Sequence, residues 1–291
     1  MTVAVACNTP EGVILGTDST ITLNDDEGRP LKTYENAVKL FQLGNKPIGI
    51  ATFGIGALGN RIIGSYLSEF ERQNPKEMVK GNANVADIAE ELRQFFLQQY
   101  QNTVVPEVER RTSKKFPEVP DIDKPVLGIV VGGFSTGAYL SEVWQILIPH
   151  NAASGSASLV TGQGDFRSSW YALCEPIFRY HKGFDNTVLD DLRNYFAQLR
   201  GTPLTAEENT AMVDILLKRE YQIPVGAMPM REAIAYVRFL VEMVINHYRF
   251  VVGSPVVGGK VQIGLATYKG QNFHILSSQE AMFALPDIGV V

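Results

Sequence analysis

The second residue of the chain, Thr2, carries the most distinctive chemistry in the sequence. If Met1 is removed, Thr2 bears a free α-amine and a hydroxyl group on one residue, and this pair can act as base and nucleophile. Cytosolic removal of Met1 requires a small second residue, and threonine meets that requirement. We therefore expect Met1 to be cleaved, and loss of this one residue to be sufficient to expose the nucleophile.

Two charged residues stand where they could support such a nucleophile. Asp18 ends a predicted strand at residues 12–18, and Lys39 opens another at residues 38–43. A lysine beside the α-amine, whose ordinary pKa is about 8, would favour the neutral amine that acts as general base. An aspartate would hold that lysine by a charge-assisted hydrogen bond. Lys32 is the competing lysine, and a lone aspartate is more often a turn or capping residue.

The remaining polar residues form no pattern typical of another chemistry. The four histidines lack the spacing of metal ligands, so we predict neither a metal nor a cofactor. Cys7 and Cys174 make no disulfide framework, and Cys7 lies in an apolar strand where an inert core thiol is expected. Gly162-Gln163-Gly164 is weak evidence for a phosphate-binding loop.

Composition narrows the class of protein further. The 291 residues are 45% hydrophobic and 20% charged, as in a globular protein, and the length suits a single domain over residues 1–291. A net charge of −5 argues against a nucleic-acid partner. Because the chain shows neither a signal-peptide pattern nor an apolar run of about twenty residues, we expect a cytoplasmic protein without a membrane partner.

Hydrophobic periodicity predicts groups of strands separated by groups of helices. The predicted strands are residues 3–8, 12–18, 38–43, 47–53, 126–131, 138–147, 158–162, 260–268 and 272–276. The predicted helices are residues 57–73, 84–109, 166–180, 188–199, 206–219 and 230–250, and residues 24–30 are predicted to be a polar loop. This order does not suit the strand–helix alternation of a parallel sheet and favours two stacked antiparallel sheets with helices outside.

Several segments resemble the proteasome β-subunit family of N-terminal-nucleophile hydrolases. T-V-A-V-A from Thr2, followed by G-V-I-L-G-T-D-S from Gly12, is similar to the start of a mature β subunit, with Asp18 at the family's spacing. A-V-K-L-F around Lys39 and I-G-I-A-T-F-G ending at Gly54 resemble the next two strands. V-G-G-K-V from Val257 resembles the entry to the last hairpin. The chain is identified as a bacterial proteasome-type protein.

The resemblance implies an α+β fold, the four-layer αββα sandwich of N-terminal-nucleophile hydrolases. It implies Thr2, Asp18 and Lys39 as catalytic residues and the Gly54 amide as the oxyanion donor, a contribution of about 3 kcal/mol. Possible supporting residues are Ser19, Gly162 and Ser254. A homo-oligomer, in a ring or a smaller assembly, is implied as well. The helical region exceeds what the family needs, which predicts a helical insertion at about residues 183–225.

The predicted function is threonine-type amide hydrolysis, as a proteasome-like peptidase acting on peptides. A small-molecule amidase of the same fold is one alternative. The other is a catalytically inactive structural or binding subunit, as proteasome α subunits are. Departures from the family pattern favour the inactive subunit: Gly162-Gln163-Gly164 stands where the family has a serine, and an aspartate and a serine are replaced near Ser254 and Val257.

Overall fold

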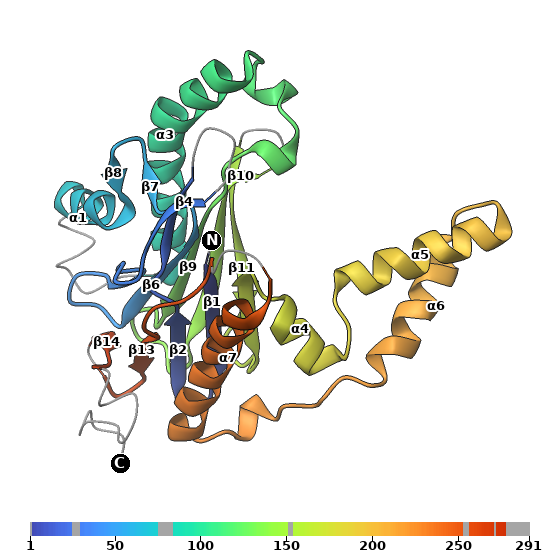
Figure 1. The fold of residues 1–291 in the computed structure, drawn as a ribbon. Coiled ribbons are helices and arrows are strands. Elements are labelled where there is room, and N and C mark those ends of the chain that lie inside the picture. The colour runs from blue at the N-terminus through green and yellow to red at the C-terminus, as the bar shows by residue number, and fades with distance from the viewer. Residues whose placement is uncertain are drawn as a thin grey trace.

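The computed structural model describes residues 2–24, 30–74, 84–150, 154–252, 256–270 and 272–277. Two five-stranded antiparallel sheets stack on each other, and helices cover the outer face of each (Figure 1). The predicted α+β class and four-layer αββα sandwich are confirmed. No helix in the described ranges combines the length and apolar character needed to cross a membrane.

The first sheet is built around the N-terminal strand β1. Its order is β12-β1-β2-β13-β14. The strands are β1 (Val3–Thr9), β2 (Gly12–Thr17), β12 (Ser168–Ala172), β13 (Gln262–Thr267) and β14 (His274–Ile275). Every residue of β1 and β2 is buried, because both faces of this sheet are covered. Strand alternation sends Ala4 and Ala6 toward the second sheet and Val3, Val5 and Cys7 toward the helices.

The second sheet supplies the other half of the central core. Its order is β11-β10-β9-β6-β5. The strands are β5 (Leu40–Gln42), β6 (Ile48–Gly54), β9 (Leu127–Gly133), β10 (Glu142–His150) and β11 (Ser154–Thr161). Leu40, Ala51 and Val130 from this sheet pack against Val13 and Leu15 of the first. The buried contact between the sheets therefore fixes β5, and with it residue 39, relative to β1 and β2.

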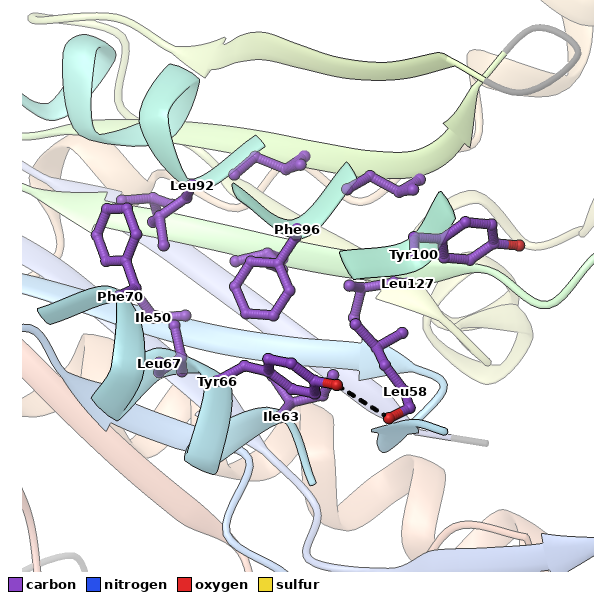
Figure 2. Close-up of a cluster of buried hydrophobic side chains, with 14 of the residues drawn as sticks. Ile50, Leu58, Ile63, Tyr66, Leu67, Phe70, Leu92, Phe96, Tyr100 and Leu127 are labelled. Carbon is purple, nitrogen blue, oxygen red and sulfur yellow. Dashed lines mark hydrogen bonds between the residues drawn. The ribbon is translucent and has the colours of Figure 1, made fainter. Parts of the chain in front are cut away.

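Helices close both outer faces. The first sheet is covered by α4 (Glu175–Lys182) and α7 (Met230–Phe250), whose Val237 and Val241 pack on it. The second is covered by α1 (Ile63–Gln73) and α3 (Val85–Thr112), which begins at the predicted Asn84 cap. Figure 2 shows the aromatic part of this core, where the Tyr66 hydroxyl donates to the Leu58 carbonyl at 3.3 Å.

Two helices stand apart from the layers. α5 (Asn186–Arg200) and α6 (Ala206–Leu217) project from the body beyond α4 (Figure 1). Only Leu189 of α5, and no residue of α6, is fully buried. We refer to α5, α6 and the turn between them as the arm.

Shorter elements connect these layers. They are β3 (Ile21–Asn24) paired with β4 (Pro30–Tyr34), β7 (Ala57–Leu58) paired with β8 (Arg61–Ile62), and the 3-10 turns η1 (Phe116–Glu118), η2 (Asp121–Asp123) and η4 (Val225–Ala227). The predicted polar loop is thus flanked by a hairpin that the sequence analysis did not predict. The helix predicted from residue 57 begins at Ile63, because β7 and β8 come first.

The predicted helix at residues 166–180 is wrong over its first half. Its first seven residues contain β12, which pairs antiparallel with β1 from Val3↔Ala172 to Cys7↔Ser168. The serine, tryptophan and tyrosine residues of this segment can adopt a strand when they pair with the edge of β1. This tertiary pairing overrides the helical pattern of the local sequence. The helix α4 starts only at Glu175, with Pro176 in its first turn, where a missing N–H costs nothing.

Candidate active site

The three predicted catalytic residues form one cluster, in which Lys39 contacts both Thr2 and Asp18. Its Nζ donates to Thr2 Oγ1 at 2.7 Å and to Asp18 Oδ1 at 2.8 Å. The three side chains are almost inaccessible, since Thr2 is 2% exposed, Asp18 0% and Lys39 5%. The competing Lys32 is exposed and lies over the Tyr34 ring, 5.7 Å from its centre. Of the two lysines considered, Lys39 is therefore the one placed beside Thr2.

The β1–β2 hairpin brings Thr2 and Asp18 together. Thr2 precedes β1, Asp18 follows β2, and the register Ala4↔Thr17 sets the two ends side by side. Two hydrogen bonds extend this pairing: Asp18 N donates to the Val3 carbonyl at 3.4 Å, and Val3 N donates to Asp18 Oδ1 at 3.2 Å. This half of the cluster is local in sequence.

Lys39 reaches the cluster from the other sheet. It precedes β5, and its carbonyl accepts from Thr52 N at 2.9 Å, which continues the β5–β6 pairing. Leu40 is buried between the sheets, and successive strand residues point to opposite faces. The position of the ammonium group against Thr2 therefore depends on how the two sheets stack.

Four donors surround the Asp18 carboxylate. Oδ1 accepts from Val3 N and Lys39 Nζ, and Oδ2 accepts from Thr20 N at 3.1 Å and Gly258 N at 3.3 Å. A buried carboxylate needs such partners because leaving it unpaired is costly. The carboxylate is thus held in one position, and it fixes the lysine that contacts Thr2.

Burial and charge act in opposite directions on Lys39. Burial lowers the pKa of its ammonium group below the ordinary value, while the Asp18 carboxylate and its hydrogen bond raise it, and burial has the larger effect. A lysine of lowered pKa releases its proton more readily than one in water. The group beside the Thr2 hydroxyl can therefore take part in proton transfer, as well as stabilise negative charge on oxygen.

Gln262 is a site residue that the sequence analysis missed. Its Oε1 accepts from Lys39 N at 3.0 Å and its Nε2 donates to the Ala37 carbonyl at 2.8 Å. Its Oε1 also lies 3.5 Å from Thr17 Oγ1, next to Asp18. One amide on β13 thus connects the segment before β5 to the end of β2, and it fixes the backbone of Lys39 relative to Asp18.

Replacing Gln262 with leucine is expected to lower amide hydrolysis by roughly 10-fold, because Lys39 N and the Ala37 carbonyl lose their partners and the ammonium moves from Thr2. Loss of these bonds is also expected to reduce the free energy of unfolding by about 1–3 kcal/mol. Hydrolysis rates and urea denaturation measure the two effects.

Gln42→Leu is the matched control, because Gln42 Nε2 bonds to the Gly44 carbonyl at 2.8 Å, away from Thr2. Equal rates for Gln262→Leu and the wild type would show that Gln262 does not position Lys39.

Ser19 supports the neighbouring backbone and makes its hydrogen bonds to residues other than Thr2. Its hydroxyl donates to the Glu35 carbonyl and accepts from Lys260 N at 2.7 Å, and its own N donates to the Gly258 carbonyl at 3.2 Å. Ser19 therefore ties the segment before β13, which supplies a donor to Asp18, to the segment before Lys39.

Gly54 lies on the strand that passes Lys39. Thr52 N donates to the Lys39 carbonyl, and Gly54 lies two residues after Thr52 on the same strand. Its φ is +81°, and a Cβ there would overlap the Val126 carbonyl oxygen, so glycine is required by both conformation and space.

Gly162, another predicted supporting residue, is not brought to the cluster. Gly162 lies in a turn with Asp165, whose carbonyl accepts from Asn8 Nδ2 at 2.9 Å. Asn8 is six residues from Thr2 along β1, about 20 Å in an extended strand, so this turn lies at the opposite end. Ser254 lies outside the described residues. Val257 is 1% exposed and packs in the core between the first sheet and its helices.

Neither cysteine competes with Thr2 as a nucleophile. Both thiols are buried, and burial raises the pKa of Cys7 and of Cys174 to about 12. The thiolate is the reactive form of cysteine, so both groups are inert at neutral pH. Within the described ranges, no group of three or more metal-ligating side chains gathers.

Comparison with known proteins finds solved structures that resemble this chain at low sequence identity. No family model and no curated protein matches this sequence. The chain is similar to Anbu (ancestral beta-subunit) from Yersinia bercovieri, with 9% identity and a TM-score of 0.48, over 95% of this chain and 87% of that one. It is also similar to the Anbu (Gly-1) mutant from Hyphomicrobium sp. strain MC1, with 10% identity and a TM-score of 0.49, over 92% and 82%.

These findings correct the family assignment. The assignment to the proteasome β-subunit family, as a bacterial proteasome-type protein, is wrong: no family model matches, and the two similar structures named above are Anbu proteins of 9% and 10% identity. The short segments that suggested it surround the cluster and say little about the remaining chain. Support for catalytic roles of Thr2, Asp18 and Lys39 therefore comes from the contacts among these three residues.

Proposed function

We propose that this protein is an N-terminal-threonine amide hydrolase with Thr2 as nucleophile after removal of Met1. The observation that carries the proposal is the buried Lys39 Nζ, which contacts both Thr2 Oγ1 and Asp18 Oδ1. A threonine hydroxyl is a weak nucleophile at neutral pH and needs an adjacent base or cation. A buried ion pair is costly to build and gives little net stability, which favours a functional reason for one at this position.

In the proposed reaction, Thr2 Oγ attacks the carbonyl carbon of an amide and transfers its proton to the free α-amine of the same residue. The tetrahedral intermediate collapses as the carbon–nitrogen bond breaks, and the proton passes to the leaving amine. An ester between Thr2 and the acyl group remains. Water, deprotonated by the same α-amine, hydrolyses this ester and restores the hydroxyl.

Lys39 and Asp18 have separate roles in this scheme. The Lys39 ammonium, at hydrogen-bond distance from Oγ1, stabilises negative charge on that oxygen as it attacks. Its positive charge also disfavours protonation of the nearby α-amine and so keeps the base neutral. Asp18 does not contact the hydroxyl in this scheme and acts by holding Lys39. The Gly54 amide is proposed as oxyanion donor, on the strand beside Lys39.

Peptides are the proposed substrates, and small acyl amides are the alternative within the same chemistry. A panel of fluorogenic peptide amides and short acyl amides tests the proposal, using protein whose N-terminus has been sequenced as Thr2. Turnover of at least one amide, lost in Thr2→Ala, is expected. Failure to turn over any amide with Thr2 exposed would favour the non-catalytic alternative, a structural or binding role.

A further inference from the structure

Ala172, the last residue of β12, has an unusual backbone conformation. Its φ is +65°, in the left-handed region that residues other than glycine, asparagine and aspartate rarely adopt. Within the described ranges, the only other non-glycine residue of positive φ is Ser113, at +54°, which ends helix α3, where this conformation is common. Ala172 ends a strand and has no such role. A strained residue persists only where its surroundings enforce the strain, and such residues gather at functional sites.

The residues on either side of Ala172 pack in different parts of the core. Tyr171 is buried between the two sheets, where its ring stacks on Phe53 with a centroid distance of 5.4 Å. Leu173 and Cys174 pack in the core between the first sheet and its helices. In a regular strand, residues 171 and 173 would point to the same face. The left-handed residue between them therefore turns Leu173 from the side of the second sheet to the side of the helices.

This turn carries a hydrogen bond to the proposed nucleophile. Leu173 N donates to the Thr2 carbonyl at 3.1 Å, and Cys174 N donates to the Ala172 carbonyl at 2.9 Å. The bond to Thr2 lies one residue beyond the last pair of the β1–β12 ladder. It restrains the backbone of Thr2, whereas the bond from Lys39 Nζ restrains its side chain.

The backbone of Thr2 carries both reacting groups of the proposed hydrolysis. The α-amine and the hydroxyl belong to one short residue, so a displacement of its Cα atom moves base and nucleophile together. A misplacement of about 1 Å can lower a rate by about 10²-fold. We propose that Ala172 is a positioning residue: its left-handed conformation directs the Leu173 N–H onto the Thr2 carbonyl and so fixes the residue that bears base and nucleophile. This inference rests on the proposed function.

Substitutions at Ala172 can test its backbone apart from packing, because its side chain is exposed. Threonine and asparagine add polar side chains of similar size, but β-branched threonine resists the left-handed conformation that asparagine tolerates. For amide hydrolysis, Ala172→Thr is expected to lower kcat by about 10-fold or more with KM within about twofold of the wild type. Ala172→Asn is expected to keep both constants within about twofold.

Ser113→Thr is the matched control. Ser113 is also exposed and left-handed, but it ends a helix on the outer face of the second sheet. Its substitution is expected to lower the urea midpoint, as Ala172→Thr does, and to leave kcat unchanged. Ala172→Gly is expected to raise the midpoint and keep kcat, because glycine adopts this conformation without strain.

Hydrogen exchange of the Leu173 amide gives a readout that needs no activity. Its protection is expected to fall by about 10-fold or more in Ala172→Thr and to stay at the wild-type level in Ala172→Asn, because only threonine turns this N–H from the Thr2 carbonyl. If the wild type hydrolyses no amide, the proposed function fails, while exchange still shows whether Ala172 holds Thr2.

Circular dichroism confirms that the variants compared are folded. Wild-type kcat in Ala172→Thr, or unchanged protection of Leu173, would overturn the proposal. So would an equal loss of kcat in Ala172→Asn, since side-chain size would then be the cause, or in Ser113→Thr, since general destabilisation would be. A change in KM alone would assign Ala172 to substrate contact. A lower urea midpoint in Ala172→Gly would contradict strain at this residue.

Discussion

Replacing Thr2 with alanine is expected to reduce amide hydrolysis by at least about 10³-fold while the fold persists. The substitution removes the attacking oxygen and leaves the α-amine, the Lys39–Asp18 pair and both sheets in place. The structural cost is one hydrogen bond, from Lys39 Nζ at 2.7 Å, so stability should fall by no more than about 1–3 kcal/mol. Initial rates on the amide panel and urea denaturation provide the two readouts.

Two control variants accompany Thr2→Ala. Thr2→Ser keeps a hydroxyl on the N-terminal residue and should retain measurable hydrolysis. Thr161→Ala removes a buried hydroxyl that has no hydrogen-bond partner in the described part of the chain, at the end of β11, and should hydrolyse amides like the wild type. Wild-type rates in Thr2→Ala would exclude Thr2 as the nucleophile.

Replacing Asp18 with asparagine is expected to destabilise the protein by about 3–5 kcal/mol, because the Lys39 ammonium would remain buried without its counter-charge. Hydrolysis should fall by about 10²-fold or more, since the lysine would no longer be held against Thr2. Denaturant titration measures the first effect and kcat the second.

Asp190→Asn is the control, because Asp190 also pairs with a cation, Arg193, at 2.8 Å, but the side chains of both residues are exposed. Its loss should cost less than about 1 kcal/mol. Similar losses for the two asparagine variants would contradict the buried ion pair as the cause.

A double variant separates stability from function. Lys39→Met added to Asp18→Asn removes the stranded ammonium, so the pair should recover part of the stability lost in Asp18→Asn alone. The double variant should remain inactive, because no cation contacts Thr2 Oγ1. Recovery of stability without recovery of hydrolysis is the expected signature of an ion pair retained for chemistry.

The sequence predicted the parts of this molecule that depend on local pattern. Strands β1 and β2 follow from alternating and continuous apolar runs with turn chemistry between them, and one hairpin register is enough to bring Thr2 beside Asp18. The α3 cap at Asn84 was predictable for the same reason, since its side chain accepts from Ala86 N, two residues away. Layer order followed from the grouping of strands and helices.

The parts that escaped prediction depend on contacts between distant residues. β12 forms because residues 168–172 pair with β1, and the local sequence of that segment does not indicate which strand it pairs with. Gln262 meets Lys39 across 223 positions of sequence, and a glutamine at a strand start has no local feature that marks it. The contact of Lys39 with Thr2 depends likewise on sheet stacking, and a short-motif resemblance suggested it where periodicity could not.

The central claim is that Thr2 is the mature N-terminus and the nucleophile. Incubation with an α′,β′-epoxyketone peptide, which reacts with a hydroxyl and an α-amine on the same residue, followed by intact mass spectrometry and peptide mapping, tests it most directly. The expected result is a single species with the mass of the chain without Met1 plus one inhibitor, attached at Thr2 and absent in Thr2→Ala. A chain that retains Met1, or an adduct mapped to any other residue, would contradict it.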